Sequence, residues 1–565
     1  MFSRIVVALC AVGLVACAPK PEAAPAADPF EAFVTATIER HFQLDPAFAV
    51  YQGRHDFDGR LPDWSEAGLA AQKAFLQEAI AKAQSFTGLT AAQAFECDYL
   101  VQVMRGKLFW LAEADDPHRN PAFYVGGGLD PNVYISREYA DPATRLKAVI
   151  AFLRAVPAAT TQIRANLRMP MPASFIYYGS KGFGGFAEYY AGDVKVAFAQ
   201  VQDVALQQQL AEASAAAAAS MRELAKWLDQ HAATATQDYA LGPQKFARML
   251  RDTEAVDISL DELERVGRAD LQRNQQALRE ACVRYAPGAS IPACMARMNA
   301  RKPAQGPVQA ATAQIPELRA FVMEQELVSI PGTEQALVRE SPPYNRQNSA
   351  YIDPPGPYEK GIPSIYYISP ADPAWTPAVQ AAFLPGESDL LFTTVHEVMP
   401  GHFLQFLHAN RSPSLFGRLY VGYAYAEGWA HYAEELMWEA GLRGTPETQI
   451  GQLSNALLRD CRFLSAIGLH ARGMSQAQSQ ALFEQQCFQD EGTALQQAAR
   501  GTYDPAYLNY TLGKLMIRRL REDWTASRGG RTAWKAFHDQ FLGYGGPPIP
   551  LVRGAMMGTG PSAVF

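Results

Sequence analysis

Two histidines and a glutamate lie within one short stretch of this chain, residues 394–405. They are His396, Glu397 and His402, and they follow an apolar run. Imidazoles are common zinc ligands, and a glutamate next to the first histidine can take a proton from a water held by the metal. A zinc ion with neutral imidazole ligands also brings the pKa of such a water towards neutrality. The stretch therefore predicts metal-dependent hydrolysis, with Glu397 as general base.

The spacing of the two histidines differs from that of a regular zinc-binding helix. They are six residues apart, which places them about 120° apart around an ideal helix, so a straight helix would not direct both at one ion. Pro400 and Gly401 lie between them. Because proline interrupts helical hydrogen bonds and glycine tolerates a distorted backbone, we expect a kink that turns His402 back towards His396. The alternative is a helix that stops at Met399 and leaves two unrelated surface histidines.

A third ligand is expected from residues 424–435, which have the aromatic, alanine and acidic pattern of a helix. Glu427, His431 and Glu434 recur there at helical spacing and so share one face. Two histidines and one glutamate leave a coordination position of zinc open, as a catalytic site requires. We expect Glu427 to be the third ligand, with His431 and Glu434 orienting the ligands. The alternative is an amphipathic surface helix with a solvated acidic face.

The two segments, HEVMPGHFLQ at 396–405 and AEGWAHYAEE at 426–435, resemble the bacterial family called domain of unknown function 885. Its members carry HExxPGHxxQ followed by EGWAxYAE and are similar to zinc metallopeptidases of the His-His-Glu type. The resemblance implies that His396, His402 and Glu427 bind Zn²⁺ and that Glu397 is the general base.

Two downstream segments also carry the resemblance, GLHARG at 468–473 and NYTLGKL at 509–515. By the resemblance, His470 and Tyr510 stabilise the oxyanion that forms when an amide is attacked. Without it, a capping histidine and a core tyrosine are the simpler interpretation. The chain has Ala466 and Met474 where the family pattern has Asp and Trp, which bears on the orientation of His470. Four basic residues are candidates to bind a substrate carboxylate: Arg472, Lys514, Arg518 and Arg521.

The expected fold is mainly α-helical, a two-lobed zincin-like metallopeptidase fold with a deep cleft and a small β element beside the active-site helix. The expected function is that of a zinc-dependent peptidase acting on peptide substrates in the bacterial cell envelope. Two alternatives stay open: a non-catalytic envelope lipoprotein that contains a metal and binds peptides, and a metal-dependent hydrolase of a non-peptide amide or ester. Glu397 and the open coordination position favour an enzyme.

The first residues have the features of an export signal. An apolar run too short to span a bilayer ends in LVAC, which resembles a bacterial lipobox. We expect residues 1–17 to be a lipoprotein signal peptide, Cys17 to carry a lipid anchor, and residues 18–29 to form a Pro/Ala tether. An ordinary secretory signal is the alternative. The protein would then lie in the cell envelope, on the periplasmic side of the outer membrane.

The rest of the chain, residues 30–565, is expected to form the catalytic domain, divisible into lobes 30–255 and 256–565. Its composition suits a large core, since 48% of the 565 residues are hydrophobic. A net charge of −7 argues against a nucleic-acid partner.

Five cysteines remain once the signal and anchor are set aside, and an exported protein can oxidise them. Cys282 and Cys294 flank a loop with proline and glycine and are the first expected disulfide. Cys461 with Cys487 is the second pairing considered, and it leaves Cys97 free. No CxxC pair occurs in the sequence, so a cysteine zinc site is not expected.

Apolar residues at helical spacing predict helices at 69–83, 91–112, 142–167, 194–233, 256–285 and 316–328, and from Pro377 almost to Tyr544. Segments rich in glycine or proline are expected to be loops, at 124–128, 177–185 and 341–361. Residues 364–369 predict a strand, either an exposed edge to which an extended substrate adds or a short buried strand.

Overall fold

The structure is a computed structural model, and it describes residues 28–342, 346, 349–371, 376–558 and 565. The predicted signal peptide and the lipid anchor on Cys17 lie outside these residues. Asp28 accepts hydrogen bonds from the N–H groups of Phe30 and Glu31 and so caps α1 (Pro29–Leu44). The last two residues of the predicted tether therefore belong to the start of the first helix.

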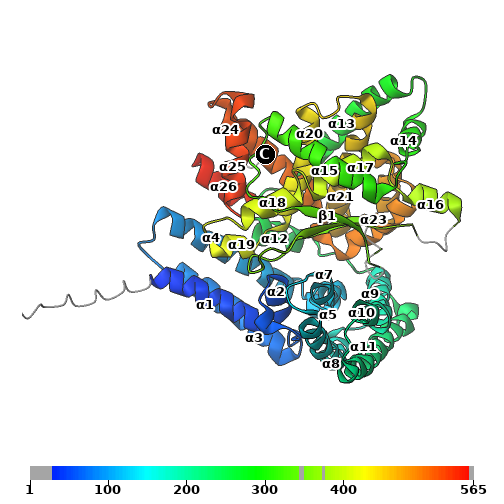
Figure 1. Ribbon diagram of the computed structural model, residues 1–565. Coiled ribbons are helices and arrows are strands. Elements are labelled where there is room, and N and C mark those ends of the chain that lie inside the picture. The colour runs from blue at the N-terminus through cyan, green and yellow to red at the C-terminus, as the bar shows by residue number, and fades with distance from the viewer. Residues whose placement is uncertain (1–27, 343–345, 347–348, 372–375, 559–564) are drawn as a thin grey trace, which may run out of the picture.

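The N-terminal helices form the lower part of the molecule in Figure 1, coloured blue to green. After α1 they are α2 (Pro46–Tyr51), α3 (Glu66–Gln84), α4 (Ala91–Leu108), α5 (Asp116–Arg119), α6 (Ala122–Val125), α7 (Asn132–Ser136), α8 (Pro142–Asn166), α9 (Ala173–Ala191), α10 (Asp193–Ala197) and α11 (Val204–Gln230). Their apolar faces share one core, which includes Phe42, Leu100, Leu153 and Met221.

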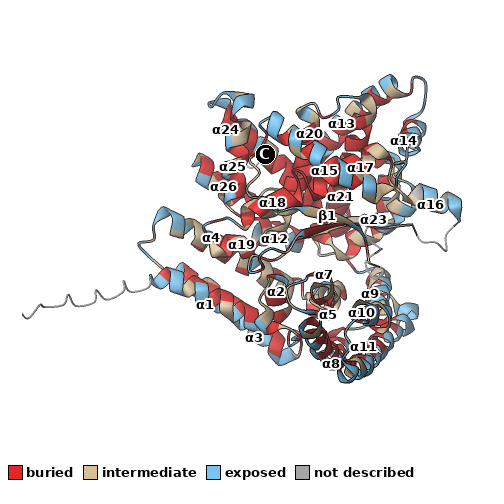
Figure 2. Cartoon of the chain, viewed as in Figure 1, coloured by how far each residue is buried: buried red, intermediate tan, exposed pale blue. Residues whose placement is uncertain are grey.

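The later helices form the upper part of Figure 1 around a second core, which includes Leu278, Phe392, Trp429 and Leu512. They are α12 (Pro243–Glu254), α13 (Leu260–Tyr285), α14 (Ile291–Asn299), α15 (Pro307–Glu324), α16 (Pro377–Phe383), α17 (Glu387–Glu397), α18 (His402–Ala409), α19 (Leu415–Leu419), α20 (Tyr423–Glu439), α21 (Pro446–Ala471), α22 (Gln476–Cys487), α23 (Glu491–Tyr503), α24 (Asn509–Ala526), α25 (Trp534–Gly543) and α26 (Ile549–Met557). Figure 2 shows that α17, α18, α20 and α21 are largely buried.

The mainly helical character is confirmed, and several predicted helices are found close to their expected bounds. They are α3, α4, α8 and α13, the last capped by Ser259, whose side chain accepts from the Glu262 N–H. By length and composition α8 could cross a membrane, but half of its apolar window is buried inside the molecule. It packs along α11, as a core helix does.

Three predictions about the first helices and loops are wrong. Residues 177–185 are not a loop but part of α9, where a Cβ on Gly179 would lie 2.6 Å from Pro121, so glycine allows close helix packing. The single helix predicted over 194–233 is interrupted, because Asp203 caps a new helix at α11. The helix predicted from Pro316 begins at Pro307, with Pro316 in its interior.

A small three-stranded sheet consists of β1 (Ala336–Glu340), β2 (Ala350–Asp353) and β3 (Ser364–Ile368). The strand order is β1-β3-β2, with β1 parallel and β2 antiparallel to β3. β2 lies inside the segment predicted to be a loop, which corrects that prediction. Because β3 is central and every residue of it is buried, the hypothesis of an exposed edge is wrong and the buried-strand alternative is confirmed.

Both predicted disulfides are present. Cys282 pairs with Cys294 and Cys461 pairs with Cys487. Cys97 is free, as expected, and it is buried. The second disulfide joins α21 to α22, and α21 passes directly beside the candidate site.

Candidate metal centre

The two histidines come from two different helices. α17 ends at Glu397 and α18 begins at His402, so the helix stops rather than kinks. Even so, both histidines are buried and their ring centroids are only 4.8 Å apart. The predicted convergence is therefore found, although a helix break produces it.

Gly401 makes this tight junction possible. Its N–H donates to the carbonyl of Val395 at 2.9 Å, which folds the chain back onto the end of α17. A Cβ at this position would lie 1.8 Å from the carbonyl oxygen of His396, so only glycine fits. The Trp429 indole N–H, from α20, donates to the Pro400 carbonyl at 2.8 Å and holds the junction against that helix.

Glu427 reaches both histidines from α20. Its Oε2 lies 3.2 Å from Nε2 of His396 and 3.3 Å from Nε2 of His402. The three ligand atoms lie within 4.8 Å of one another and could hold a metal ion. The Glu427 side chain is 21% exposed, so the group meets solvent on that side.

The dimensions of this group suit zinc. Two ligand atoms that each lie about 2.0–2.1 Å from a tetrahedral zinc ion are about 3.3–3.4 Å from each other. The two distances from Glu427 Oε2 to the imidazole nitrogens match this separation. The donor set of two imidazoles and one carboxylate also leaves a fourth position open. The residues present could therefore hold a metal ion, and their donor types are those that zinc takes.

Glu434 orients the first histidine. The Nδ1–H of His396 donates to Glu434 Oε1 at 2.7 Å, which leaves Nε2 to face Glu427. Burial disfavours the charge on Glu434, but Arg459 at 3.3 Å and the hydrogen bond from His396 hold its pKa below the usual range. His431, the other predicted orienting residue, lies one step further out, 3.7 Å from Glu434, and burial lowers its pKa to about 4.

Glu397 lies at the end of α17, next to His396 in the chain, and its side chain is buried. Burial raises its pKa, and Glu427 adds to this, whereas the two histidines and Arg459 lower it. A carboxylate whose pKa is raised accepts protons more readily, which suits a general base.

The structure brings Tyr510 to the group. Its ring centroid is 6.3 Å from that of His396, and the residue is buried. Burial and the charge of Glu427 raise the pKa of Tyr510, so the hydroxyl keeps its proton at neutral pH and can donate it.

His470 lies elsewhere on α21. Its Nε2–H donates to the Gly501 carbonyl at 2.7 Å, and its Nδ1 accepts from the Leu241 N–H at 3.3 Å. Burial lowers its pKa to about 4, and its ring stacks on Phe246. Because both ring nitrogens bind backbone groups, the structure does not join His470 to the cluster.

The four basic residues expected to bind a substrate carboxylate already have carboxylate partners in the chain. The pairs are Arg472–Asp261, Lys514–Asp270, Arg518–Glu435 and Arg521–Glu439. Three other arginines lie closer to the candidate centre and were missed: Arg459, Arg462 and Arg500. Arg459 and Arg462 are about one helical turn apart in a segment, 456–469, whose other residues are mostly apolar. Charged side chains are rare in such segments unless they are paired or functional, and this was the available signal.

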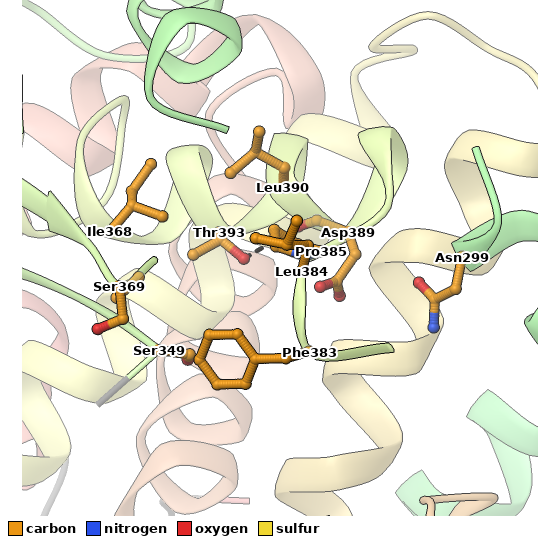
Figure 3. A pocket seen from close by; sticks show the side chains of 11 residues that line it. Asn299, Ser349, Ile368, Ser369, Phe383, Leu384, Pro385, Asp389, Leu390 and Thr393 are labelled. Carbon is orange, nitrogen blue, oxygen red and sulfur yellow. Dashed lines mark hydrogen bonds between the residues drawn. The ribbon is translucent and has the colours of Figure 1, made fainter. Parts of the chain in front are cut away.

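A cavity of about 130 Å³ lies against α17 (Figure 3). It is lined by Asp389, Leu390 and Thr393 of α17 and by Ile368 and Ser369 at the end of β3. Burial raises the pKa of Asp389. None of the three ligand residues lines this cavity, and the deep cleft between two lobes stays a prediction.

Fold and site together define a mainly helical protein with a small sheet and a buried His-His-Glu group that could hold a metal ion. The chain belongs to a family described as a bacterial protein of unknown function (DUF885), which matches residues 46–556. The family resemblance is therefore confirmed, whereas the relation to zinc metallopeptidases stays a prediction.

Two solved structures have similar folds. A proposed lipoprotein of unknown function from Shewanella oneidensis superposes with a TM-score of 0.77 and 24% identity, over 94% of this chain and 100% of that chain. A proposed lipoprotein from Colwellia psychrerythraea has a TM-score of 0.76 and 16% identity, over 93% of this chain and 97% of that chain. At these identities the likeness shows the fold alone. No curated protein matches the chain.

Proposed function

We propose that this protein is a zinc-dependent peptidase of the bacterial cell envelope. The observation that carries the proposal is the convergence of His396, His402 and Glu427, with two separations that match tetrahedral zinc. A purely structural zinc site takes four protein ligands, whereas three leave a position for water or substrate.

Each residue of the site has a separate role in the proposed reaction. His396, His402 and Glu427 would hold the zinc ion, which when bound supplies a Lewis acid that polarises a carbonyl and acidifies water. Glu397 takes the proton of the attacking water and passes it to the leaving amine. Tyr510 donates its hydroxyl proton in a hydrogen bond to the oxygen on which negative charge develops.

The proposed location is the cell envelope, with Cys17 as the site of a lipid anchor. The LVAC motif supports it, and both similar solved structures are described as proposed lipoproteins. Two disulfides also suit a compartment that is oxidising. The outer membrane, on its periplasmic side, is part of the same proposal.

The test is Glu397→Gln, which keeps the size of the side chain but removes the base. Zinc-loaded wild type is expected to cleave members of a mixed peptide library, and the variant to be slower by about 10²–10⁴-fold, the usual contribution of a general base. Zinc content, measured by atomic emission, is expected to be unchanged. Glu280→Gln, on the exposed face of α13, is the matched control.

Absence of peptide cleavage by the zinc-loaded wild type, or equal cleavage by Glu397→Gln, would defeat the peptidase proposal. Binding of peptides without cleavage would favour the non-catalytic metal-containing lipoprotein. Cleavage of amide or ester compounds but of no peptide would favour the non-peptide hydrolase.

A further inference from the structure

Three guanidinium groups surround the ring of Tyr510. The Cζ atoms of Arg462, Arg459 and Arg500 lie 4.8, 5.7 and 6.0 Å from its centroid. The same ring stacks beside His396. A cluster of positive charge therefore lies next to the candidate metal centre, with Tyr510 in contact with both.

Two of these arginines have carboxylate partners. Arg459 pairs with Glu434 at 3.3 Å, and Arg500 pairs with Asp504 at 2.9 Å. Arg462 differs: its Nε–H donates to the neutral side chain of Gln497 at 2.8 Å. Among the residues that the structure describes, no carboxylate lies within 4.0 Å of it.

Arg462 is nevertheless only 8% exposed. Burial of a charge without an opposite charge is unfavourable, because the lost hydration is not replaced. Burial and the neighbouring Arg500 accordingly lower the pKa of the Arg462 guanidinium. The arrangement is one that an anionic ligand would complete, since arginine binds a carboxylate through two parallel hydrogen bonds.

We infer that Arg462 binds the C-terminal carboxylate of a peptide substrate, so that the enzyme is a carboxypeptidase. The inference rests on the proposed function and names the substrate class of the same site. In the reaction, water adds its hydroxyl to the scissile carbonyl carbon, the C–N bond breaks, and the amine of the released C-terminal residue or dipeptide takes the proton.

The distance between His396 and Arg462 suits a short C-terminal segment of the substrate. The Tyr510 centroid is 6.3 Å from His396 and 4.8 Å from the Arg462 Cζ, so that carbon is at most about 11 Å from the His396 ring. One extended residue spans about 3.3–3.6 Å. The carboxylate would therefore be one or two residues from the bond that is cut.

The test compares peptides that differ only at the C-terminus, as a free acid or as an amide, with the zinc-loaded full-length protein. Wild type is expected to prefer the free acid by about 10²–10³-fold in kcat/KM, the usual effect of leaving a buried charge unpaired. Arg462→Gln is expected to lose this preference, chiefly by a higher KM for the free acid. Arg462→Lys keeps the charge and is expected to recover part of it.

Arg472→Gln is the control, because this arginine directly follows the last residue of α21, is exposed and pairs with Asp261 and Glu264. It is expected to keep the full preference for the free acid. A third peptide, an amide with a glutamate as its last residue, separates a terminal carboxylate from one on a side chain. The inference would be overturned if wild type preferred this peptide over the plain amide as strongly as it prefers the free acid.

A binding measurement separates this inference from the proposed function. Calorimetry with Glu397→Gln is expected to show the free acid binding about 10²-fold tighter than the amide, and a second change, Arg462→Gln, to remove the difference. Equal cleavage of acid and amide by wild type would overturn the inference and leave the peptidase standing. If the free acid binds more tightly than the amide but wild type cleaves neither, the carboxylate site is supported and the peptidase proposal is contradicted.

Thermal unfolding tests whether Arg462 has a purely structural role. Because Arg462→Gln removes a buried charge that lacks a carboxylate partner, its melting temperature is expected to equal or exceed that of wild type. A large fall in both Arg462 variants, with the preference for the free acid unchanged, would overturn the inference.

Discussion

At the scale of single residues, His396 is central to the site because its two ring nitrogens have different partners. Nδ1–H donates to Glu434 and Nε2 faces Glu427. A carboxylate behind a ligating imidazole selects the tautomer and makes the other nitrogen a better ligand. Without a metal, burial opposes protonation of His396, but the two carboxylates outweigh it and raise its pKa to about 9.

The change Glu434→Gln is predicted to weaken zinc binding by about 10–100-fold, the usual effect of removing an orienting partner. Glutamine keeps the volume but not the charge that holds the tautomer. Affinity is measured by competition with a chromophoric chelator. Glu439→Gln, further along α20 and paired with Arg521, serves as control. Unchanged zinc affinity in Glu434→Gln would show that this hydrogen bond is not needed for the metal.

At the scale of elements, glycines allow the helices that carry the site to approach each other. Gly401 joins α17 to α18, and Gly428 of α20 faces Gly513 of α24. A Cβ on Gly428 would lie 2.4 Å from the Gly513 Cα. Gly428 follows Glu427 directly and Gly513 is close to Tyr510 in the chain. The close contact between α20 and α24 therefore places Glu427 and Tyr510 near each other.

Gly401→Ala is predicted to destabilise the protein by more than about 3 kcal/mol, the upper end of the usual cost of overpacking. The added methyl would overlap the His396 carbonyl, so the junction has to open and His402 moves away. Urea unfolding gives the stability, and metal analysis is expected to show loss of zinc. Gly543→Ala, where a Cβ meets no atom within 4 Å, is the control. Full zinc occupancy in Gly401→Ala would contradict this account.

At the scale of the whole molecule, the helices that carry the site pack into the second core, whereas other residues of the later chain pack into the first. Phe416, Leu419 and Tyr420 come from the later part of the chain but pack into the N-terminal core. The division of residues 30–565 into two lobes at residue 255 stays a prediction. Glu254 lies close to this point, at the end of α12, and it is buried where that helix meets the start of α24.

Glu254 is predicted to make the stability of the protein depend on pH. Asn509 donates to its Oε1 at 2.9 Å, and hydrogen bonding from the Ala424 backbone and from Asn509 offsets only part of the effect of burial. Burial raises its pKa from 4.5 to about 7. The folded state therefore keeps the proton that the unfolded state loses, and stability falls as pH rises from 4.5 to about 7, by about 1.4 kcal/mol per pH unit.

Glu254→Gln is expected to remove this loss, which amounts to about 3 kcal/mol in total at pH 8. Urea unfolding at pH 5 and at pH 8 measures it, with the exposed Glu280→Gln as control. The variant is expected to be more stable than wild type at pH 8 and close to it at pH 5. Equal pH dependence in the variant and wild type would assign the effect to other groups.

The sequence alone was enough for the helical class, for most of the long helices and for both disulfides. It also pointed to His396, His402 and Glu427, because residue type and local spacing single them out within two short segments and the family resemblance joins those segments. It failed at 177–185, where one of the glycines that suggest a loop, Gly179, instead allows a helix to pack closely on Pro121 and Leu228. Composition does not distinguish glycine needed for a turn from glycine needed for contact.

Only the tertiary structure decided which residues meet. Helical periodicity tells which side chains share a face but not what that face contacts, so the positions of Arg462 and His470 could not be predicted from it. Both lie on α21, yet one faces Tyr510 and the other binds the backbone of Gly501. The sequence by itself determined the kinds of group available for the chemistry. Their distances, partners and charge balance come from contacts between segments far apart in the chain.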